Sequence, residues 1–524
     1  MKNVIILHTD QQRYDSLGCN GNANAKTFNI DALAEDGCRF TRHISANTTC
    51  MPSRASLLTG LYVPGHGVCS NGIPLWRREP EDDRVSDRIS MNLFGKTVED
   101  KVPTLADRLV DAGFETALFG KLHLEPHLSP KAYGFYESND AWKEASIEED
   151  EKPYYGFQYK RLIMGHGEMP CGYNFGHYGR WLHKKHPEVA KMVEEGKDKI
   201  KQPSERGDIF LSSLPPELHN SMWLAEEVCD YLDDKRDEEK PMFLFVGFPD
   251  PHHPFTPPEE VAKDFMDIPL PDFAKLSDIK GDKPSKVVKT MESRFVEDVD
   301  CEYAYKNTMA SVHLIDKAVG KIITHLKEKG LYDETIIIFT SDHGDYLGDF
   351  NMLQKNDIAF NNLLHVPFII KDAVESDKGD VVGNDGREKA VTSGDLPKVI
   401  DTPMSNTDVV PTVLNMLGME VDEDIQGVDI FNEANRDNTP MVTCFGVTTE
   451  YRNISLYDDT YRYTYYLATG EEELYNHKKD LKEINNLVND SDTDVSEICR
   501  AMKTKLMVKH VQSDLGIYRH YSLW

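Results

Sequence analysis

The chain has 524 residues and a formal net charge of -30, with 40% hydrophobic and 28% charged residues. This composition is typical of a globular protein and excludes extensive disorder. The acidic balance argues against a broad surface for nucleic acid or for an anionic membrane, because such surfaces need clustered Lys and Arg. A small anionic substrate stays possible, since the local charge of a pocket can oppose the global sign. We therefore expect neither a nucleic-acid nor a membrane partner.

The N-terminal sequence shows no signal peptide. The apolar run Val4–Leu7 is short and meets His8, whereas a secretory signal needs roughly 7–15 apolar residues. No stretch approaches the roughly 20 apolar residues of a membrane helix. The nine cysteines are odd in number and match no CxxC pattern, which favours reduced thiols. These features predict a cytoplasmic protein.

Apolar runs of strand length alternate with helical stretches over residues 1 to about 425. The candidate strands are short and bounded by polar, Gly or Pro residues; they are Asn3–Thr9, Phe114–Phe119, Pro241–Phe248, Thr335–Thr340 and Val366–Ile370. The clearest helices are Pro103–Ala112, Met222–Asp233 and Cys301–Lys329, the last ended by Gly330. The alternation predicts an α/β fold with a mostly parallel central sheet flanked by helices.

Two departures from this alternation mark the predicted domains. Residues 140–220 have little periodicity and many aromatic and charged side chains, which indicates an insertion over the edge of the sheet. After about residue 438, β-branched and aromatic residues predict a small antiparallel sheet, followed by a helix near Asp492–Val508. We therefore expect a catalytic α/β domain over 1–430 and a C-terminal α+β subdomain over 431–524. Residues 373–400 are predicted to form an exposed excursion.

Four of the candidate strands run directly into reactive polar residues. These are Asp10-Gln11, Lys121-Leu122-His123, Asp250-Pro251-His252-His253 and Asp342-His343. Ligands of open α/β sheets bind at the carboxyl ends of strands, so parallel strands would gather these side chains on one rim. Carboxylates suit Ca²⁺ or Mg²⁺, while an imidazole favours Mn²⁺ or Zn²⁺. A single Asp after a strand is more often a helix cap, but four such strand ends together predict a divalent metal site.

Cys50 stands at the start of a predicted helix. Pro52 suits its first turn and Gly60 can end it. The free N–H groups of a helix start favour an anion, and Arg54 adds a bidentate donor suited to sulfate or phosphate. From its context alone, Cys50 is as readily a buried thiol as a nucleophile.

The segment CMPSRASLLTG, which begins at Cys50, resembles the signature C-x-P-S-R-x-x-x-L-T-G of the type I, formylglycine-dependent sulfatases. These belong to the alkaline-phosphatase-like superfamily, and the resemblance extends over nearly the whole chain. Further similar elements are Gly120–His123, Pro251–Phe255, Ser341–Lys355 and Glu473–Asn476. The Asp-Gln and Asp-His pairs of the metal strands resemble the subtype that holds choline and carbohydrate sulfatases, and also phosphonate monoester and phosphodiester hydrolases.

The resemblance implies a modified nucleophile. In this family a separate maturation enzyme converts the cysteine to Cα-formylglycine, whose hydrated aldehyde carries two hydroxyls. One hydroxyl attacks sulfur and releases the alcohol; the other then loses its proton, so that the aldehyde re-forms and sulfate leaves. The maturation enzyme and a small sulfated substrate are therefore the expected partners.

The resemblance also implies a role for each matching residue. The metal ligands are Asp10, Gln11, Asp342, His343 and the group formed from Cys50, with Ca²⁺ favoured by family precedent and Mn²⁺ or Mg²⁺ as alternatives. Arg54 would hold the diol, His123 would act as the base that collapses the sulfated diol, and His252 would protonate the leaving oxygen, aided by Lys355. Lys121 and Lys355 would neutralise charge on the sulfuryl oxygens. The expected substrate-binding residues are Asn71, Lys121, His252 and Lys355.

The implied function is that of a sulfuric ester hydrolase acting on an O-sulfate monoester of a sugar or another small organic sulfate, with choline sulfate among the candidates. The alternative is a phosphonate monoester or phosphodiester hydrolase, although those relatives typically lack the Lys121/His123 pair. A catalytically silent binding protein is disfavoured because every catalytic position is filled.

Two substrate and assembly questions stay open in the sequence. The insertion holds aromatic and polar side chains that suit a sugar ring or simply pack the insertion: Tyr154, Tyr155, Tyr173, His177, Arg180 and Trp181. The apolar tail Gly516–Trp524 would dock on its own domain or on another subunit, so we expect a homo-oligomer.

Overall fold

The computed structural model describes residues 2–77, 101–144, 146–147, 152–165, 174–373, 396–435, 437–445, 452–491 and 493–514. The C-terminal tail and most of the excursion predicted at 373–400 lie outside these residues. Among the described helices, none is both long and apolar enough to cross a membrane. The eight cysteines described are free thiols.

The central sheet runs in the order β10-β2-β9-β8-β1-β7-β3-β4, with β11 beside β2. Its strands are β1 (Asn3–Thr9), β2 (Cys38–Ile44), β3 (Glu115–Gly120), β4 (Tyr159–Leu162), β7 (Met242–Gly247), β8 (Thr335–Ser341), β9 (His365–Lys371), β10 (Val399–Ile400) and β11 (Met404–Ser405). The core strands β8, β1, β7 and β3 are parallel to their neighbours within this group. The mixed α/β fold with a mainly parallel sheet is therefore confirmed.

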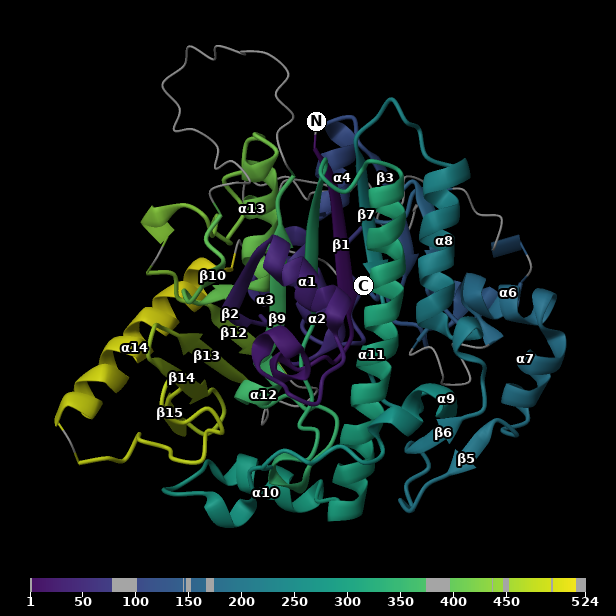
Figure 1. Cartoon of the computed structure of the whole chain (residues 1–524). Helices are drawn as coiled ribbons and strands as arrows, with labels where there is room; N and C mark the ends of the chain where they lie inside the picture. Colours follow the sequence, from purple (N-terminus) through teal and green to yellow (C-terminus); the bar gives the residue numbers. More distant parts are fainter. Residues whose placement is uncertain are drawn as a thin grey trace.

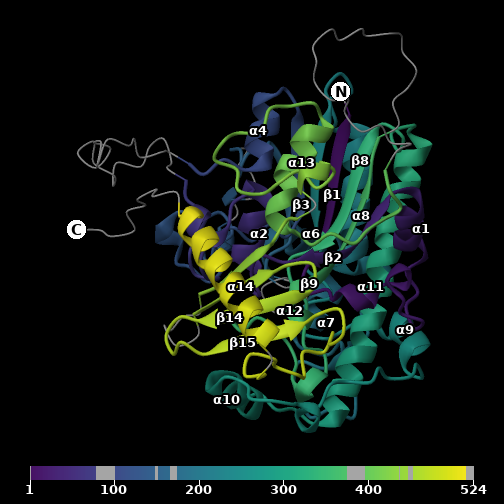
Figure 2. The same ribbon diagram turned by 90° about the vertical axis from the view of Figure 1, so that its left-hand side faces the viewer.

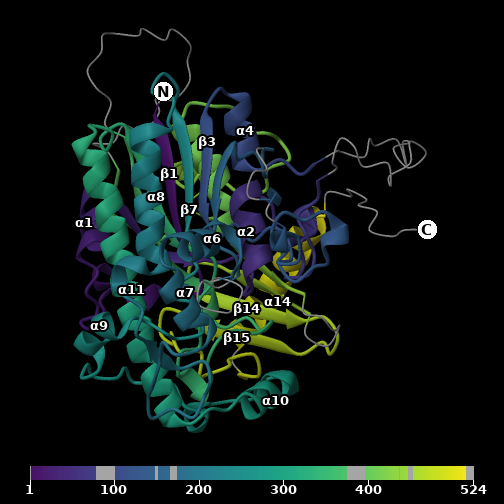
Figure 3. The ribbon, with the colours of Figure 1, turned by 90° about the vertical axis from the view of Figure 1, so that its right-hand side faces the viewer.

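Helices cover both faces of this sheet (Figures 1 and 3). On one face lie α1 (Phe28–Asp36), α8 (Asn220–Asp234) and α11 (Asp298–Glu328), and on the other lie α2 (Cys50–Thr59), α4 (Leu105–Asp111) and α13 (Val409–Met416). In β1, Val4 and Ile6 join the core beneath α2, whereas Ile5 and Leu7 join the core beneath α11. Because successive side chains of a strand point to opposite faces, one uniformly apolar strand serves both layers.

The direction of β9 and the presence of β2 differ from the predicted strands, and the short strands β4, β10 and β11 were not predicted either. The strand expected at Val366–Ile370 is present as β9, but it runs antiparallel to both β8 and β2. An apolar run buried on both faces has the same pattern in either direction, so its sequence does not encode its polarity. β2 was not among the candidate strands, because Arg39 and Thr41 interrupt its apolar residues on the partly exposed face.

The insertion at 140–220 lies at the sheet edge. β4, within it, pairs in parallel with β3 and extends the sheet, and it is followed by α6 (Gly176–Lys185), α7 (Pro187–Glu194), β5 (Lys199–Lys201) and β6 (Phe210–Ser212). Tyr154, Tyr155 and His177 are buried: the Tyr155 hydroxyl donates to the Leu75 carbonyl and the His177 ring accepts from Leu162 N. These side chains pack the insertion. Trp181 packs against the core on the side of α8 and α11, whereas Tyr154 and Tyr155 belong to the core on the side of α2; Tyr173 lies outside the described residues.

The C-terminal part holds a four-stranded antiparallel sheet, β12 (Met441–Cys444), β13 (Asn453–Tyr457), β14 (Tyr461–Tyr466) and β15 (Glu472–Asn476). α14 (Thr493–Gln512) crosses this sheet (Figure 2), and its Met502 and Leu506 bury against Ile454 and Leu474. Other α-helices in the described part of the chain are α3 (Val63–His66), α9 (Glu259–Ala262), α10 (Ser285–Ser293) and α12 (Asn361–Leu364). The antiparallel sheet and the helix after it match the sequence analysis.

Candidate active site

The four strands that end in polar residues are neighbours in the sheet. β8, β1, β7 and β3 lie side by side and point the same way, so their carboxyl ends deliver Asp342, Asp10, His252 and Lys121 to one edge. The rim predicted from the sequence is therefore present. The predictions could place these residues on the rim but could not say which atoms would meet.

Cys50 is the first residue of α2, whose ten residues are all buried. Gly60 ends the helix with φ +73°, a left-handed conformation that glycine adopts without strain. The Asn71 side-chain oxygen accepts a hydrogen bond from Met51 N at 3.0 Å and so satisfies one free N–H of the helix start. Asn71 thus has a structural contact at this site, and its role in binding substrate stays a prediction.

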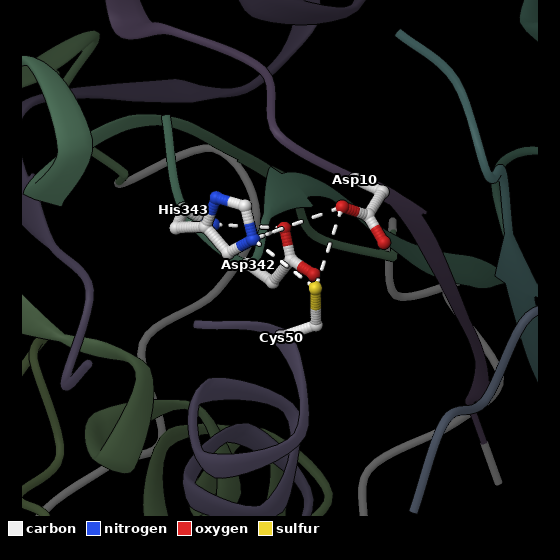
Figure 4. Close-up of side chains that lie close together, drawn as sticks. All are labelled: Asp10, Cys50, Asp342 and His343. Atoms are coloured by element: carbon white, nitrogen blue, oxygen red, sulfur yellow. Dashed lines mark hydrogen bonds and ion pairs between the residues drawn. The ribbon is translucent and has the colours of Figure 1, made fainter. Parts of the chain in front are cut away.

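Four candidate metal ligands converge in front of this helix (Figure 4). One ligand atom from each of Asp10, Cys50, Asp342 and His343 lies within 4.8 Å of the others, and all four residues are buried. His343 Nε2 is 3.7 Å from an oxygen of each carboxylate and 3.3 Å from Cys50 Sγ. Two carboxylates and one imidazole, held this close without exposure to water, form a donor set that fits a divalent cation.

Arg54 fixes the two carboxylates from behind. Its Nε donates to Asp342 Oδ2 at 2.8 Å and its Nη2 to Asp10 Oδ2 at 3.1 Å. The Oδ1 atoms of both residues remain on the side of His343 and Cys50. Burial opposes the charged carboxylates, but Lys121, His252 and Arg54 hold the pKa of Asp10 well below its usual value. Burial and Asp10 oppose the charge of Asp342, but His343 and Arg54 hold its pKa below the usual value. Both ligands are therefore anionic, as metal binding requires.

Gln11 extends this cluster to a residue that the sequence analysis did not assign. Gln11 has φ +65°, and its Nε2 donates to Asp345 Oδ2 at 2.6 Å. That contact leaves the amide oxygen facing the centre, where it accepts from Lys355 Nζ at 3.2 Å. Burial raises the pKa of the Asp345 carboxyl to about 6. The one feature of the sequence that could have pointed to Asp345 is its position three residues after the predicted ligand Asp342.

Three cationic or proton-bearing groups surround Cys50. Lys355 Nζ lies 3.0 Å from Cys50 Sγ and 2.8 Å from His252 Nε2, and Lys121 Nζ contacts Asp10 Oδ2 at 2.6 Å. Burial and Asp10 disfavour a thiolate, but Lys355, Lys121 and His343 together bring the pKa of Cys50 below its ordinary value. The position is built to receive negative charge.

His123 lies beside Lys121 on the loop that follows β3, with only 3% of its surface exposed. Burial, followed by the charges of Lys121, His127 and Arg54, holds the pKa of its imidazole well below the usual value. A neutral imidazole is the form that can accept a proton. His253, next to His252, stacks on that ring at a centroid distance of 3.9 Å and approaches Gln11 Nε2, so it forms a wall of the site.

Comparison with known proteins places these residues in a family context. The family model described as "Sulfatase" matches residues 2–419. The chain is 26% identical over 503 residues to the arylsulfatase of Clostridium perfringens, covering 93% of this chain and 90% of that one.

Solved structures share the fold. The phosphonate monoester hydrolase of Agrobacterium radiobacter superposes with a TM-score of 0.72 at 22% identity, covering 98% of this chain and 96% of the other. BT4656, solved with its substrate D-glucosamine-2-N,6-O-disulfate, superposes with a TM-score of 0.66 at 18% identity over 98% of both chains. The sulfatase model spans most of the chain, and the metal-binding group lies where the sulfatase signature begins: the chain belongs to the sulfatase family.

Proposed function

We propose that this sulfatase hydrolyses an O-sulfate monoester of a sugar or another small organic sulfate, and that its nucleophile is the hydrate of a formylglycine made from Cys50. The observation that carries the proposal is the position of Cys50 Sγ. It lies within 3.3 Å of both His343 Nε2 and Lys355 Nζ, at the start of a helix. An oxygen nucleophile at this carbon would meet the candidate metal ligands and a cation at once.

A divalent cation held by Asp10, Asp342, His343 and the Gln11 amide would lower the pKa of the nucleophile and polarise the sulfuryl group. The identity of the ion is part of the proposal, with Ca²⁺ as our expectation. Arg54 holds the two carboxylates in place by its paired contacts.

The remaining side chains divide the charge and proton transfers. Lys355 lies beside Cys50 and Lys121 beside Asp10, and both neutralise the sulfuryl oxygens as negative charge builds. His252, 2.8 Å from Lys355, gives its proton to the oxygen of the departing alcohol. Neutral His123 then removes the proton of the second hydroxyl of the hydrate, so that the carbonyl re-forms and the carbon–oxygen bond to the sulfate breaks, which releases sulfate.

A phosphonate monoester or phosphodiester hydrolase is the second candidate, supported by the fold shared with the Agrobacterium radiobacter enzyme. Lys121 and His123 favour a sulfatase, because phosphonate monoester and phosphodiester hydrolases typically lack this pair. Here both residues belong to the site: Lys121 Nζ contacts Asp10, and the buried imidazole of His123 is neutral. A sugar substrate is in keeping with BT4656, which was solved with a sulfated glucosamine.

Two measurements test the proposal. The chain is produced together with a formylglycine-generating enzyme, and mass analysis of the peptide containing Cys50 should show the loss of mass expected for conversion of the thiol to an aldehyde. The matured protein is then assayed on an aryl sulfate, sugar sulfates, choline sulfate, a phosphonate monoester and a phosphodiester. Turnover confined to the last two substrates would overturn the sulfatase assignment, and activity without conversion at Cys50 would overturn the nucleophile.

A further inference from the structure

The loop after β3 carries His123 in an unusual backbone conformation. His123 has φ +58°, in the left-handed region that residues with a Cβ atom rarely adopt. The loop begins at Lys121, whose carbonyl accepts from Arg54 Nη1 at 2.8 Å, so its start is fixed to the active site. A strained residue beyond that point persists only where its surroundings determine the conformation.

The side chain of Glu137 holds His123 in this conformation. Its Oε1 accepts from His123 N at 2.7 Å, and its Oε2 accepts from Glu125 N at 3.3 Å. One carboxylate therefore holds two alternate N–H groups of the loop, on either side of Leu124. Hydrogen bonds from backbone N–H groups to a carboxylate are among the stronger ones in proteins.

Glu125, on the loop, makes the reciprocal contact to the backbone of Glu137. Its Oε2 accepts from Glu137 N at 3.2 Å, so each glutamate binds the backbone of the other. We call this reciprocal arrangement of Glu125 and Glu137 the glutamate clamp. The side chain of Glu137 is buried, with only 5% of the residue exposed, and Glu125 is half-buried.

The clamp rests on a rigid support. Asn139 N donates to the His127 carbonyl at 2.8 Å, and Trp142 Nε1 donates to the Tyr136 carbonyl at 2.8 Å. Trp142 is 1% exposed and belongs to the main core. The segment that presents Glu137 is thus tied to the end of the loop through Asn139 and anchored in the core through Trp142.

Burying two carboxyls together is unfavourable, which argues that the arrangement serves more than packing. Burial raises the pKa of Glu137 to about 7, and burial together with the charge of Glu137 raises the pKa of Glu125 to about 8. Apolar side chains of similar size would fill this space at lower cost, but they could not accept from His123 N. The backbone contact is what the acids provide.

We propose that Glu137 is a positioning residue for His123: the glutamate clamp holds the His123 backbone so that its imidazole stands at the reacting group formed from Cys50. This inference rests on the role given to His123 in the proposed function. It assigns a task to two residues that no sequence motif singled out.

The test is a double-mutant cycle on the matured enzyme, using the best substrate found in the ester screen. Glu137→Gln keeps the size of the side chain but replaces one accepting oxygen with an NH₂ group. We expect kcat to fall by about 10- to 100-fold, the range in which slight misplacement acts, with KM nearly unchanged. In a His123→Ala background the same change should cost nearly nothing, because the group that it positions is gone.

Glu144→Gln is the matched control, since Glu144 is an exposed acid of the same segment that pairs with Lys131; its kcat should equal that of the unmodified sequence. A second readout is the NMR signal of the His123 imidazole, assigned by its absence in His123→Ala, which should shift in Glu137→Gln and stay unmoved in Glu144→Gln.

Equal losses of kcat in the two backgrounds, or an unshifted His123 signal, would overturn the positioning role. Failure of the proposed function would look different. In that case the parent enzyme turns over no sulfate ester, while the NMR comparison still reports whether Glu137 holds His123.

Discussion

Arg54 and Arg462 each lie in a buried cluster of charged residues, and of these two clusters only the one around Arg54 has the arrangement of an active site. Arg54 at the edge of the central sheet is 0% exposed, and Arg462 in β14 is 1% exposed. Each binds carboxylates in the protein interior. The difference lies in how the remaining donor and acceptor atoms are used.

In the C-terminal cluster the carboxylate oxygens meet donors. Glu483 receives Arg462 Nε on one oxygen and Asn361 N on the other. Both oxygens of Glu473 accept tyrosine hydroxyls, from Tyr475 and Tyr466. The cluster closes on itself, as buried charges in a structural role do.

In the cluster around Arg54, only the Oδ2 atoms of Asp10 and Asp342 are occupied by the guanidinium. Their Oδ1 atoms face His343 and converge with Cys50; Asp342 Oδ1 also accepts from the backbone N–H groups of Gln11 and His343. Buried charge by itself therefore does not mark a functional site. Convergence of ligand atoms on one point does, and substitutions in the two clusters should therefore have different effects.

The largest effect is expected from Cys50→Ala, compared with the matured parent enzyme. Turnover should fall by at least about 10⁴-fold, the scale on which loss of a nucleophile acts, while thermal unfolding stays close to that of the parent. Both are measured on one preparation by kinetics and calorimetry. Residual activity of a few per cent would mean that the convergence point does not hold the nucleophile.

His252→Ala should lower turnover by about 10²- to 10⁴-fold for alkyl sulfates, which leave poorly without a proton. Activated aryl sulfates should lose much less, because their leaving groups need no acid. The measurement is kcat for both ester types. A similar loss for the two would remove the general-acid role from His252.

Arg462→Leu tests the C-terminal cluster, in which Arg462 binds Glu483. It leaves Glu483 buried without its cation, and breaking a buried pair in this way costs about 3–5 kcal/mol of unfolding free energy. Denaturant titration should show this loss, while kcat of the folded fraction stays near the parent value. A large drop in kcat at unchanged stability would show that the two clusters are not separate in function.

Removing the metal should lower the stability of the protein through the cluster around Arg54, which holds the candidate metal ligands. The protein is stripped with a chelator and its unfolding midpoint is followed against added Ca²⁺, Mn²⁺ or Mg²⁺. An ion present at 100 times its Kd should stabilise the fold by about 2.7 kcal/mol, and Asp342→Asn should abolish that gain. Equal stabilisation of the parent and of Asp342→Asn would place the ion elsewhere.

The glutamate clamp predicts a dependence of stability on pH. The folded-state pKa of Glu125, raised to about 8 by burial and by Glu137, exceeds its ordinary value of about 4.3 in unfolded chains. The folded protein therefore binds the extra proton, and this contribution to stability is complete below the unfolded pKa and lost as pH rises through 8. The slope is at most about 1.4 kcal/mol per pH unit for one proton.

Glu125→Gln should flatten this decline between pH 5 and 8 in urea unfolding, an interval set by the two pKa values. The groups that face the pair are Glu137, Lys121, Arg54 and Tyr154, so Glu137 leaves some slope in the variant. Glu144→Gln, an exposed acid, should leave the slope as it is. An undiminished slope in Glu125→Gln would show that Glu125 is not the proton-binding group.

Much of the site followed from the sequence because it rests on strand ends. Apolar runs that stop at Asp10, Lys121 and Asp342 predict both the sheet and its reactive rim. The direction of β9 did not follow, because an apolar run has no polarity. Glu137 was also missed: it works through backbone N–H groups of a loop, and no spacing in the sequence announces such a contact.

The burial of α2 has a consequence for the order of events in making this enzyme. All ten of its residues, from Cys50 to Thr59, are enclosed in the finished fold. A separate protein that oxidises Cys50 would need that segment extended and within reach, and the finished fold offers neither. The modification that we propose therefore has to happen on the nascent or unfolded chain, and a batch that has folded with its thiol intact cannot be repaired by adding the modifying enzyme afterwards.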